Sequence, residues 1–370
     1  MNNSVRVIAF YLPQFYPTKE NDDWWGKGFT EWTNVGKAKP LFKGHYQPRV
    51  PADLGYYDLR LPIVREQQAD MAKNAGIEGF CYWHYWFGNG KTILSEIFNE
   101  VLISGKPDFP FCLGWANTSW TRRSWNGVDY KGKEILIEQL YPGDEDIIAH
   151  FYSVLPAFKD NRYIRIDEKP VFLIYKPLEL PNPEKFINIW NSLAIKNGEK
   201  GVFFIGHDRE INDNVINILE MGFDAVNPEY IERMPIRLLK SEFLMRLQRF
   251  ISYNFTSISP LKRYNYKNVI EKWFTNNDRK DNVFPTIIPN WDRSPRGGKA
   301  SLIFTGSTPD LFREHVLQAL EVLNKKPDNR KILFLKSWNE WAEGNYMEPD
   351  LKFGHGYLNV LKEVLDQNKN

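Results

Sequence analysis

The sequence is poor in the features that mark several large classes of protein. It has two cysteines in 370 residues, Cys81 and Cys112, and both lie inside apolar runs. This setting favours buried free thiols over a disulfide. No Cys/His cluster has the spacing of zinc ligands, and there is no P-loop, G-x-S-x-G elbow or H-E-x-x-H pair. We therefore expect neither a metal nor a cofactor.

The charge balance and the length of the apolar runs exclude further classes. The formal net charge of +2 gives no global reason to expect nucleic acid as a partner. No apolar run is long enough to span a bilayer, and the N-terminus lacks the pattern of a secretory signal. We expect a cytoplasmic protein, although a chain whose leader had been removed would have the same sequence. The sequence carries no signal for the oligomeric state.

Short runs rich in β-branched and aromatic residues recur along the chain, and each is bounded by Gly, Pro, Asp or Asn. Such runs predict strands, here at residues 5–12, 79–87, 110–117, 169–176, 202–207, 223–228, 284–291 and 331–338. Helical patterns fall between them, at residues 59–76, 94–105, 144–158, 183–198, 212–222, 308–326 and 356–367. Alternating strands and helices indicate a parallel sheet, and eight units favour a single (β/α)₈ TIM barrel over residues 1–370. The alternative, an open doubly wound sheet, usually has a Gly-rich loop after its first strand, which is absent here.

Two connections after predicted strands are long. Residues 13–52 follow the first strand, and residues 229–282 follow the sixth and predict a helical insertion. The segment 229–280 has eleven Lys/Arg residues against five Asp/Glu. It is interpreted either as a lid with solvated charges or as a surface for an anionic glycan, a lipid-linked glycan or the membrane face.

Aromatic residues are abundant, at 15% of the chain with 13 tryptophans. Apart from Trp190 and Trp273, the tryptophans lie late in predicted strands or in the loops after strands one and three, where a barrel binds its ligand. Indole rings stack on the C–H face of a sugar, and amide, carboxylate or imidazole groups bind its hydroxyls, so we expect an oligo- or polysaccharide as partner. The alternatives are barrel packing for the tryptophans and satisfied buried imidazoles for the histidines. The candidate substrate-binding residues are Tyr11, Gln14, Trp25, Glu31, Trp32, Asn34, Trp83, His84, Trp86, Trp115, Asn117, His207, Asn227, Trp291, Asp292, Trp338, Asn339, Trp341 and Glu348.

The segment LKSWNEWAEGNYMEP at 335–349 is the strongest candidate for chemistry. Glycosidic bond cleavage needs one carboxyl group as proton donor and a second group as base or nucleophile. Glu340 and Glu343 lie three residues apart at the end of the last predicted strand, flanked by tryptophans. In a continuous strand their side chains would point to opposite faces, but where a strand turns into a loop both can face one pocket. The alternative for either residue is an ordinary salt-bridge acid.

Three stretches of the chain resemble a known family. The segments FYLPQFYPTKENDDWWGKGFTEWTNVGKAKPLFKGHYQPRVPADLGYYDL, AGIEGFCYWHYWF and SWNEWAEGNYMEP resemble the WbsX-like family of surface-polysaccharide glycosyltransferases, over residues 5 to 360. That family in turn is similar to the glycoside hydrolase family 99 endo-α-mannosidases, whose N-E-W-x-E-G motif and further Glu match Asn339 to Gly344 and Glu348. The resemblance implies a (β/α)₈ barrel that acts without a metal and retains anomeric configuration. It implies that Glu340 takes the proton of the sugar 2-hydroxyl, forming a 1,2-anhydro sugar, and that Glu343 is the acid/base.

Three functional hypotheses follow from these features. The first is an enzyme that cleaves or transglycosylates a glycosidic bond in a bacterial surface polysaccharide or its precursor. The second is a glycosyltransferase of O-antigen or lipopolysaccharide biosynthesis that uses an activated donor. The third is a glycan-binding barrel that has lost catalysis, against which both glutamates argue.

Overall fold

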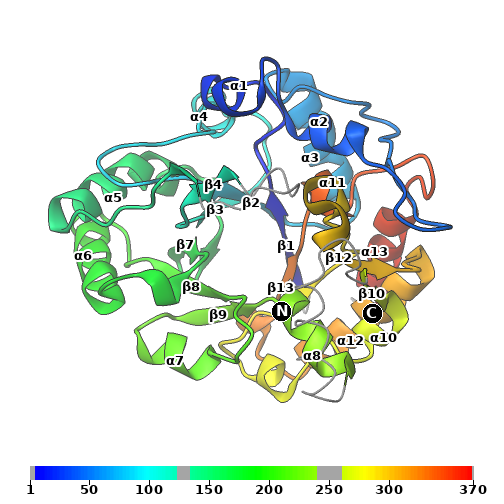
Figure 1. Cartoon of the computed structure of the whole chain (residues 1–370). Helices are drawn as coiled ribbons and strands as arrows, with labels where there is room; N and C mark the ends of the chain where they lie inside the picture. Colours follow the sequence, from blue (N-terminus) through cyan, green and yellow to red (C-terminus); the bar gives the residue numbers. More distant parts are fainter. Residues whose placement is uncertain (1–4, 123–133, 240–260, 369–370) are drawn as a thin grey trace.

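The computed structural model describes residues 5–122, 134–239 and 261–368, and these form a parallel (β/α)₈ barrel (Figure 1). Its eight strands are β1 (Arg6–Tyr11), β2 (Gly79–His84), β3 (Phe111–Trp115), β7 (Lys169–Ile174), β8 (Phe203–Asp208), β9 (Ala225–Pro228), β11 (Thr286–Ile287) and β13 (Ile332–Leu335). They pair in chain order, and β13 returns to pair with β1. A parallel bridge between Val226 and Val283 joins β9 to the residues before β11, which closes the ring. The barrel and all eight predicted strands are thus confirmed.

Helices surround the strands on the outside, as Figure 1 shows. They are α3 (Pro62–Asn74), α4 (Glu96–Ser104), α5 (Asp144–Phe158), α6 (Pro183–Lys196), α7 (Val215–Glu220), α12 (Pro309–Leu323) and α13 (Gly356–Gln367), each within a predicted segment. Local chemistry sets several of their starts. The Thr308 hydroxyl accepts from the Leu311 N–H and Pro309 occupies the first helical turn, while Asn182 and Pro183 begin α6 in the same way. The apolar stripe of each helix then packs on the barrel.

The two long connections carry additional elements. Between β1 and α3 lie α1 (Lys19–Trp25) and α2 (Glu31–Lys37). The connection after β9 holds α8 (Met234–Leu239), β10 (Lys262–Asn265) and α10 (Tyr266–Ile270), and residues 240–260 of the predicted insertion lie outside the described residues. Strand β10 pairs with β12 (Leu302–Thr305), and α11 (Ser294–Gly297) follows β11. A small hairpin of β4 (Trp120–Thr121) and β5 (Ile135–Ile137) follows β3.

Alternation along the strands decides which aromatic rings enter the barrel. Phe10 stacks on Trp83 with ring centroids 4.9 Å apart and on Phe334 at 5.2 Å, so these side chains meet inside the barrel. Gly114 on β3 makes room for the indole, because a Cβ there would lie 3.2 Å from the Trp83 ring. Both cysteines are free and buried, which confirms the prediction of unpaired thiols.

Candidate active site

The last barrel strand ends in a tight hairpin that carries both candidate acids. Strand β13 gives way to β14 (Asn339–Glu340), which pairs antiparallel with β15 (Asn345–Tyr346). The turn between them, η7 (Trp341–Glu343), closes on Gly344 at φ 68°. A Cβ at Gly344 would meet Asp292 at 2.8 Å, so this position needs glycine, and the close approach lets the Asp292 N–H donate to the Glu343 carbonyl at 2.7 Å. The hairpin folds both acids onto one side and brings their carboxyl groups within hydrogen-bonding reach.

A buried arginine from a distant segment holds one of the two acids. Arg296 in α11 donates from Nη1 to Glu343 Oε1 at 2.7 Å and from Nη2 to Glu31 Oε2 at 2.8 Å. Arg293 adds a second cation 3.4 Å from the same Glu343 oxygen. The guanidinium thus bridges the hairpin to Glu31 at the start of α2, and breaking such a buried pair leaves an uncompensated charge.

The environments of the two acids separate their proton affinities. Burial raises the pKa of Glu340 to about 8, reinforced by the negative charge of Glu343 and opposed by Lys336 and Arg296. Arg296 and Arg293 overcome the burial of Glu343 and lower its pKa to about 2. No N–H or O–H of the described residues donates to Glu340 Oε2. The cations beside Glu343 and the burial of Glu340 thus favour a singly protonated pair at neutral pH, in which Glu340 has the higher pKa.

A second charged cluster lies at the ends of β8, β9 and β13. The ammonium of Lys336 is 2.7 Å from Glu229 Oε2, and His207 Nε2 is 3.1 Å from the same oxygen. The other imidazole nitrogen of His207 contacts Asn227 Oδ1 at 2.8 Å, while the Tyr175 ring stacks on the imidazole at 5.5 Å. Lys336 and neighbouring cations hold the pKa of Glu229 well below its usual range against its burial. This cluster is a fixed set of charges beside the acid pair.

Several predicted substrate-binding residues lie around these two clusters. Glu31 pairs with Arg296, and Asn34 Nδ2 donates to Glu31 Oε1 at 3.4 Å. Lys336 lies 5.7 Å over the Trp291 ring, and Trp83 contacts Tyr175 edge-on at 5.3 Å. The residues that the structure brings together at the strand ends are Gln14, Glu31, Asn34, Trp83, His207, Asn227, Trp291 and Asp292, with Gln14 joined through its carbonyl to the Glu31 N–H.

A second group of predicted residues lies on the outer face of β2 and β3, under α5 and α6. His84 Nε2 is 2.9 Å from His150 Nε2, and the Trp86 ring stacks on the same imidazole at 4.8 Å. Trp115 packs on His150 and donates to the Trp86 carbonyl at 2.8 Å. Asn117 joins the neighbouring loops by donating to the Lys176 carbonyl at 2.9 Å. His84 directly follows the inward-facing Trp83, so strand alternation turns its side chain outward toward the helices. Trp86 and Trp115 pack on the same imidazole of His150 in α5.

A third group surrounds Glu348 beneath α3. Tyr57 and Trp341 both donate to Glu348 Oε2, at 2.9 and 2.6 Å, and Gln68 donates to Oε1 at 2.6 Å. Tyr11, Trp32 and Trp338 pack around this network, and the Asn339 side chain binds both the N–H and the carbonyl of Leu12. Trp25 lies apart, half-buried against Arg122. Most of the predicted indoles are therefore packed in the core, and only Trp24, Trp25 and Trp32 among the described tryptophans keep intermediate exposure.

Similarity to known proteins identifies the family of this chain. Residues 7–361 match the family described as "Glycosyltransferase WbsX". The chain belongs to this family. It is 34% identical over 365 residues to "Uncharacterized protein WxcX" of two strains of Xanthomonas campestris pv. campestris, B100 and ATCC 33913. The match covers 97% of this chain and 49% of the relative, so the chain spans about half the length of the curated relatives that it matches.

Solved structures share the architecture at low sequence identity. A "Glycoside hydrolase-like protein" superposes with a TM-score of 0.59 at 17% identity, covering 98% of this chain and 94% of the other. The GH99 endo-alpha-mannosidase from Bacteroides thetaiotaomicron superposes with a TM-score of 0.56 at 15% identity, covering 98% and 97%. These likenesses show a shared (β/α)₈ fold.

The cations of the site were not predicted from the sequence. Arg209, Arg293 and Arg296 come from segments that carry no motif, and Lys336 lies in the 335–349 segment but was not among the candidate residues. Arg293 and Arg296 follow the seventh barrel strand, and Lys336 follows the eighth. Their position at the ends of barrel strands, where such barrels bind their ligands, was the one feature of the sequence that could have identified them. Among residues 5–122, 134–239 and 261–368, no group of His, Cys, Asp and Glu could hold a metal ion, and no helix has both the length and the hydropathy to cross a membrane.

Proposed function

We propose that this protein breaks or remakes a glycosidic bond in a bacterial surface polysaccharide or its precursor, with Glu340 and Glu343 as the reacting pair. One observation carries the proposal: the buried Glu340 and the half-buried Glu343 bring two carboxyl groups within hydrogen-bonding reach of each other after the last barrel strand, and Arg296 binds only one of them. Glycosyl transfer to water or to a sugar requires a proton donor and a base in one site. The family match and the glycosidase-like fold support the same substrate class.

The proposed reaction retains the anomeric configuration through a neighbouring hydroxyl. Ionised Glu340 removes the proton of the 2-hydroxyl, whose oxygen bonds to the anomeric carbon as the bond to the leaving oxygen breaks. Protonated Glu343 donates its proton to that leaving oxygen. As the 1,2-anhydro ring opens, Glu343 takes a proton from the incoming water or sugar and Glu340 returns its proton to the 2-oxygen. These roles need the proton on Glu343, whereas in the free protein Glu340 has the higher pKa of the two. We propose that the proton passes from Glu340 to Glu343 across their contact when substrate enters.

The experiment begins with turnover of isolated surface glycans, followed as released oligosaccharide. Glu340→Gln and Glu343→Gln should each reduce turnover by on the order of 10² or more, the size expected for loss of a positioned acid or base. A glycan-binding barrel without catalysis would release nothing, and unchanged turnover in both variants would contradict the assignment of either residue.

The two roles are separated by the leaving group. A 2,4-dinitrophenyl glycoside of the released sugar needs no proton at its leaving oxygen, so the first release of dinitrophenolate should be restored in Glu343→Gln and not in Glu340→Gln. Rescue of Glu340→Gln instead would assign proton donation to Glu340, the residue with the higher pKa in the free protein. Both variants keep the shape of the side chain, and thermal unfolding checks that they fold.

A glycosyltransferase with an activated donor is the second candidate, favoured by the family description and by the cations near the acid pair. Arg209 lies 4.8 Å over the Tyr175 ring, and its buried Nε has no partner among the described residues. A donor diphosphate could bind there, and the basic segment 229–280 would then contact a lipid-linked glycan or the membrane surface. Consumption of a sugar nucleotide only when acceptor glycan is present tests this candidate. Release of oligosaccharide without any donor would exclude it.

A further inference from the structure

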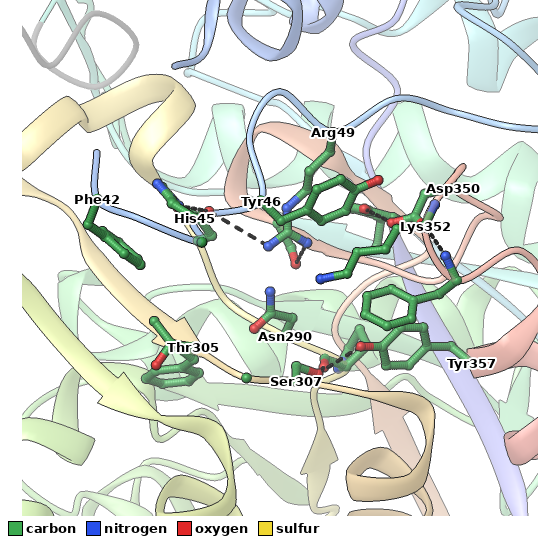
Figure 2. A pocket seen from close by; sticks show the side chains of 18 residues that line it. Phe42, His45, Tyr46, Arg49, Asn290, Thr305, Ser307, Asp350, Lys352 and Tyr357 are labelled. Carbon is green, nitrogen blue, oxygen red and sulfur yellow. Dashed lines mark hydrogen bonds and ion pairs between the residues drawn. The ribbon is translucent and has the colours of Figure 1, made fainter. Parts of the chain in front are cut away.

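A cavity of about 150 Å³ lies against the β14–β15 hairpin and is lined by Gly344 and Tyr346 but not by Glu340 or Glu343. Four segments line it: residues 42–49 of the first long connection, 289–292 after β11, 304–307 at the end of β12, and 344–357 after the acid pair. Its mouth is rimmed by the exposed residues Gly44, Gly306 and Lys352, and Asp292 forms part of its floor. Figure 2 shows side chains from these segments converging on the cavity.

The two carboxylates of this cavity are already satisfied by the protein. Asp292 Oδ2 accepts from His45 Nε2 at 2.8 Å and from Gln47 Nε2 at 2.7 Å, and its Oδ1 accepts from the Ser294 N–H. His45 Nδ1 accepts from the Leu41 N–H, which fixes the tautomer with the proton on Nε2. Asp350 accepts from the N–H groups of Lys352 and Phe353 and from the Tyr346 hydroxyl. Neither acid therefore calls for a metal or a basic ligand.

Three buried polar atoms on lining side chains have no hydrogen-bond partner among the described residues: Tyr46 Oη, Arg49 Nε and Asn290 Oδ1. Arg49 and Asn290 are the most buried of the three residues, at 7% and 9% exposed. Burying a polar atom without a hydrogen bond is costly, so such atoms point to a missing ligand. The Lys352 ammonium lies 4.8 Å over the Tyr46 ring, and in Figure 2 it reaches across the cavity toward Asn290.

The unmet groups define the chemistry of that ligand. Arg49 Nε needs an acceptor and Asn290 Oδ1 needs a donor, and a hydroxyl group can fill either role. The exposed Lys352 ammonium at the mouth can also donate to a hydroxyl group. Aromatic rings of Phe42, Tyr46, Phe304, Phe353 and Tyr357 form much of the remaining wall, suited to the C–H face of a sugar ring. A phosphate dianion would leave the Asn290 oxygen without a donor. We propose that this cavity binds one sugar residue, as a second carbohydrate site outside the acid pair.

The position of the cavity connects it to the reaction. Gly344 lines it directly after Glu343, and Asp292 joins the cavity floor to the hairpin through its N–H bond to the Glu343 carbonyl. A glycan held here would reach the acid pair around the edge of the hairpin. The cavity chemistry alone argues for a sugar, and its identity as a unit of the same glycan rests on the proposed function.

The test is binding of methyl glycosides, measured by saturation-transfer difference NMR and titrated for affinity. The panel contains methyl α- and β-glycosides of mannose, glucose, galactose, rhamnose and N-acetylglucosamine, and the proteins are Glu343→Gln alone and combined with each site variant. Lys352→Ala removes a charged donor from an exposed position and should weaken binding about tenfold. Thr305→Phe fills the cavity and should abolish binding. Lys362→Ala, an exposed lysine on α13, is the matched control and should bind as the parent does.

The outcomes separate this site from the acid pair. Binding that is weakened by Lys352→Ala and unaffected by Lys362→Ala supports the proposal, even where no glycan is turned over, and only the proposed function would then fail. Binding that Lys352→Ala leaves unchanged, or no binding by any glycoside, overturns the site while leaving the acid pair intact. Displacement of the glycoside by inorganic phosphate at equal concentration would instead assign an anion site. If Thr305→Phe does not fold by thermal unfolding, Lys352→Ala decides.

Discussion

Glu340 and Glu348 are eight residues apart in one hairpin, and both are buried acids whose pKa is raised, to about 8 and about 7. Their hydrogen bonds differ completely. Three side chains from α3, the first long connection and η7 donate to Glu348, whereas no described N–H or O–H donates to Glu340 Oε2. A raised pKa therefore does not distinguish a reacting acid from a structural one. The distinction lies in whether the protein has already used the lone pairs of the acid.

The largest effect is expected at Arg296, which binds the partner of Glu340 in the acid pair. Arg296→Met leaves Glu31 buried without its cation, and loss of one partner of a buried pair costs about 3–5 kcal/mol of unfolding free energy. Urea unfolding should show this loss. The double variant Arg296→Met with Glu31→Gln removes the orphaned charge and should recover part of it. No recovery would show that Arg296 stabilises the fold by packing alone.

The second largest effect is expected at Glu348, the acid whose oxygens are already hydrogen-bonded by the protein. Glu348→Ala leaves the donors of Gln68, Tyr57 and Trp341 without their acceptor, and we expect it to lower the unfolding free energy by about 3 kcal/mol. Glu348→Gln keeps one oxygen and should cost less. Turnover per folded molecule should stay within several-fold of the parent in both variants. A hundredfold loss of turnover with unchanged stability would instead make Glu348 part of the reacting group.

The smallest effect is the dependence of turnover on pH. The reacting pair must hold one proton, and the pKa of Glu340 near 8 is where that last proton is lost as pH rises. We therefore expect kcat/KM to be level in the neutral range and to fall about tenfold per pH unit above pH 8. Unfolding measured at the same pH values controls for stability. A profile that falls only below pH 5 would mean that the active pair carries no proton.

Much of the architecture could be predicted from the sequence because its signals are local. Apolar runs bounded by Gly, Pro and Asp gave all eight strands, and caps such as Thr308 with Pro309 gave helix starts. Strand order then followed from the alternation of strands and helices. The placement of Glu340 and Glu343 at the end of the last strand was also predicted, because the motif directly follows an apolar run.

The fate of individual aromatic rings could not be predicted in the same way. In the segment YWHYWF, Trp83 enters the barrel and contacts Phe10, while His84 turns outward to His150. The sequence shows that neighbours alternate, but not which of them faces inward, because a (β/α)₈ strand is buried on both sides and both faces are apolar. An expected sugar-binding surface of indoles therefore became, for the most part, packing between strands, helices and loops.

The sequence by itself determined the barrel, its strand order and the position of the acid pair on the last strand, because local patterning fixes these features. Only the tertiary structure decided which partners each acid has, and therefore how strongly it holds a proton. Arg296 reaches Glu343 from 47 residues away and Gln68 reaches Glu348 from 280 residues away. The proton affinity of a buried carboxyl depends on the charges and donors that surround it in space. Those groups come from segments far apart in the sequence, and no local pattern predicts that they will be in contact.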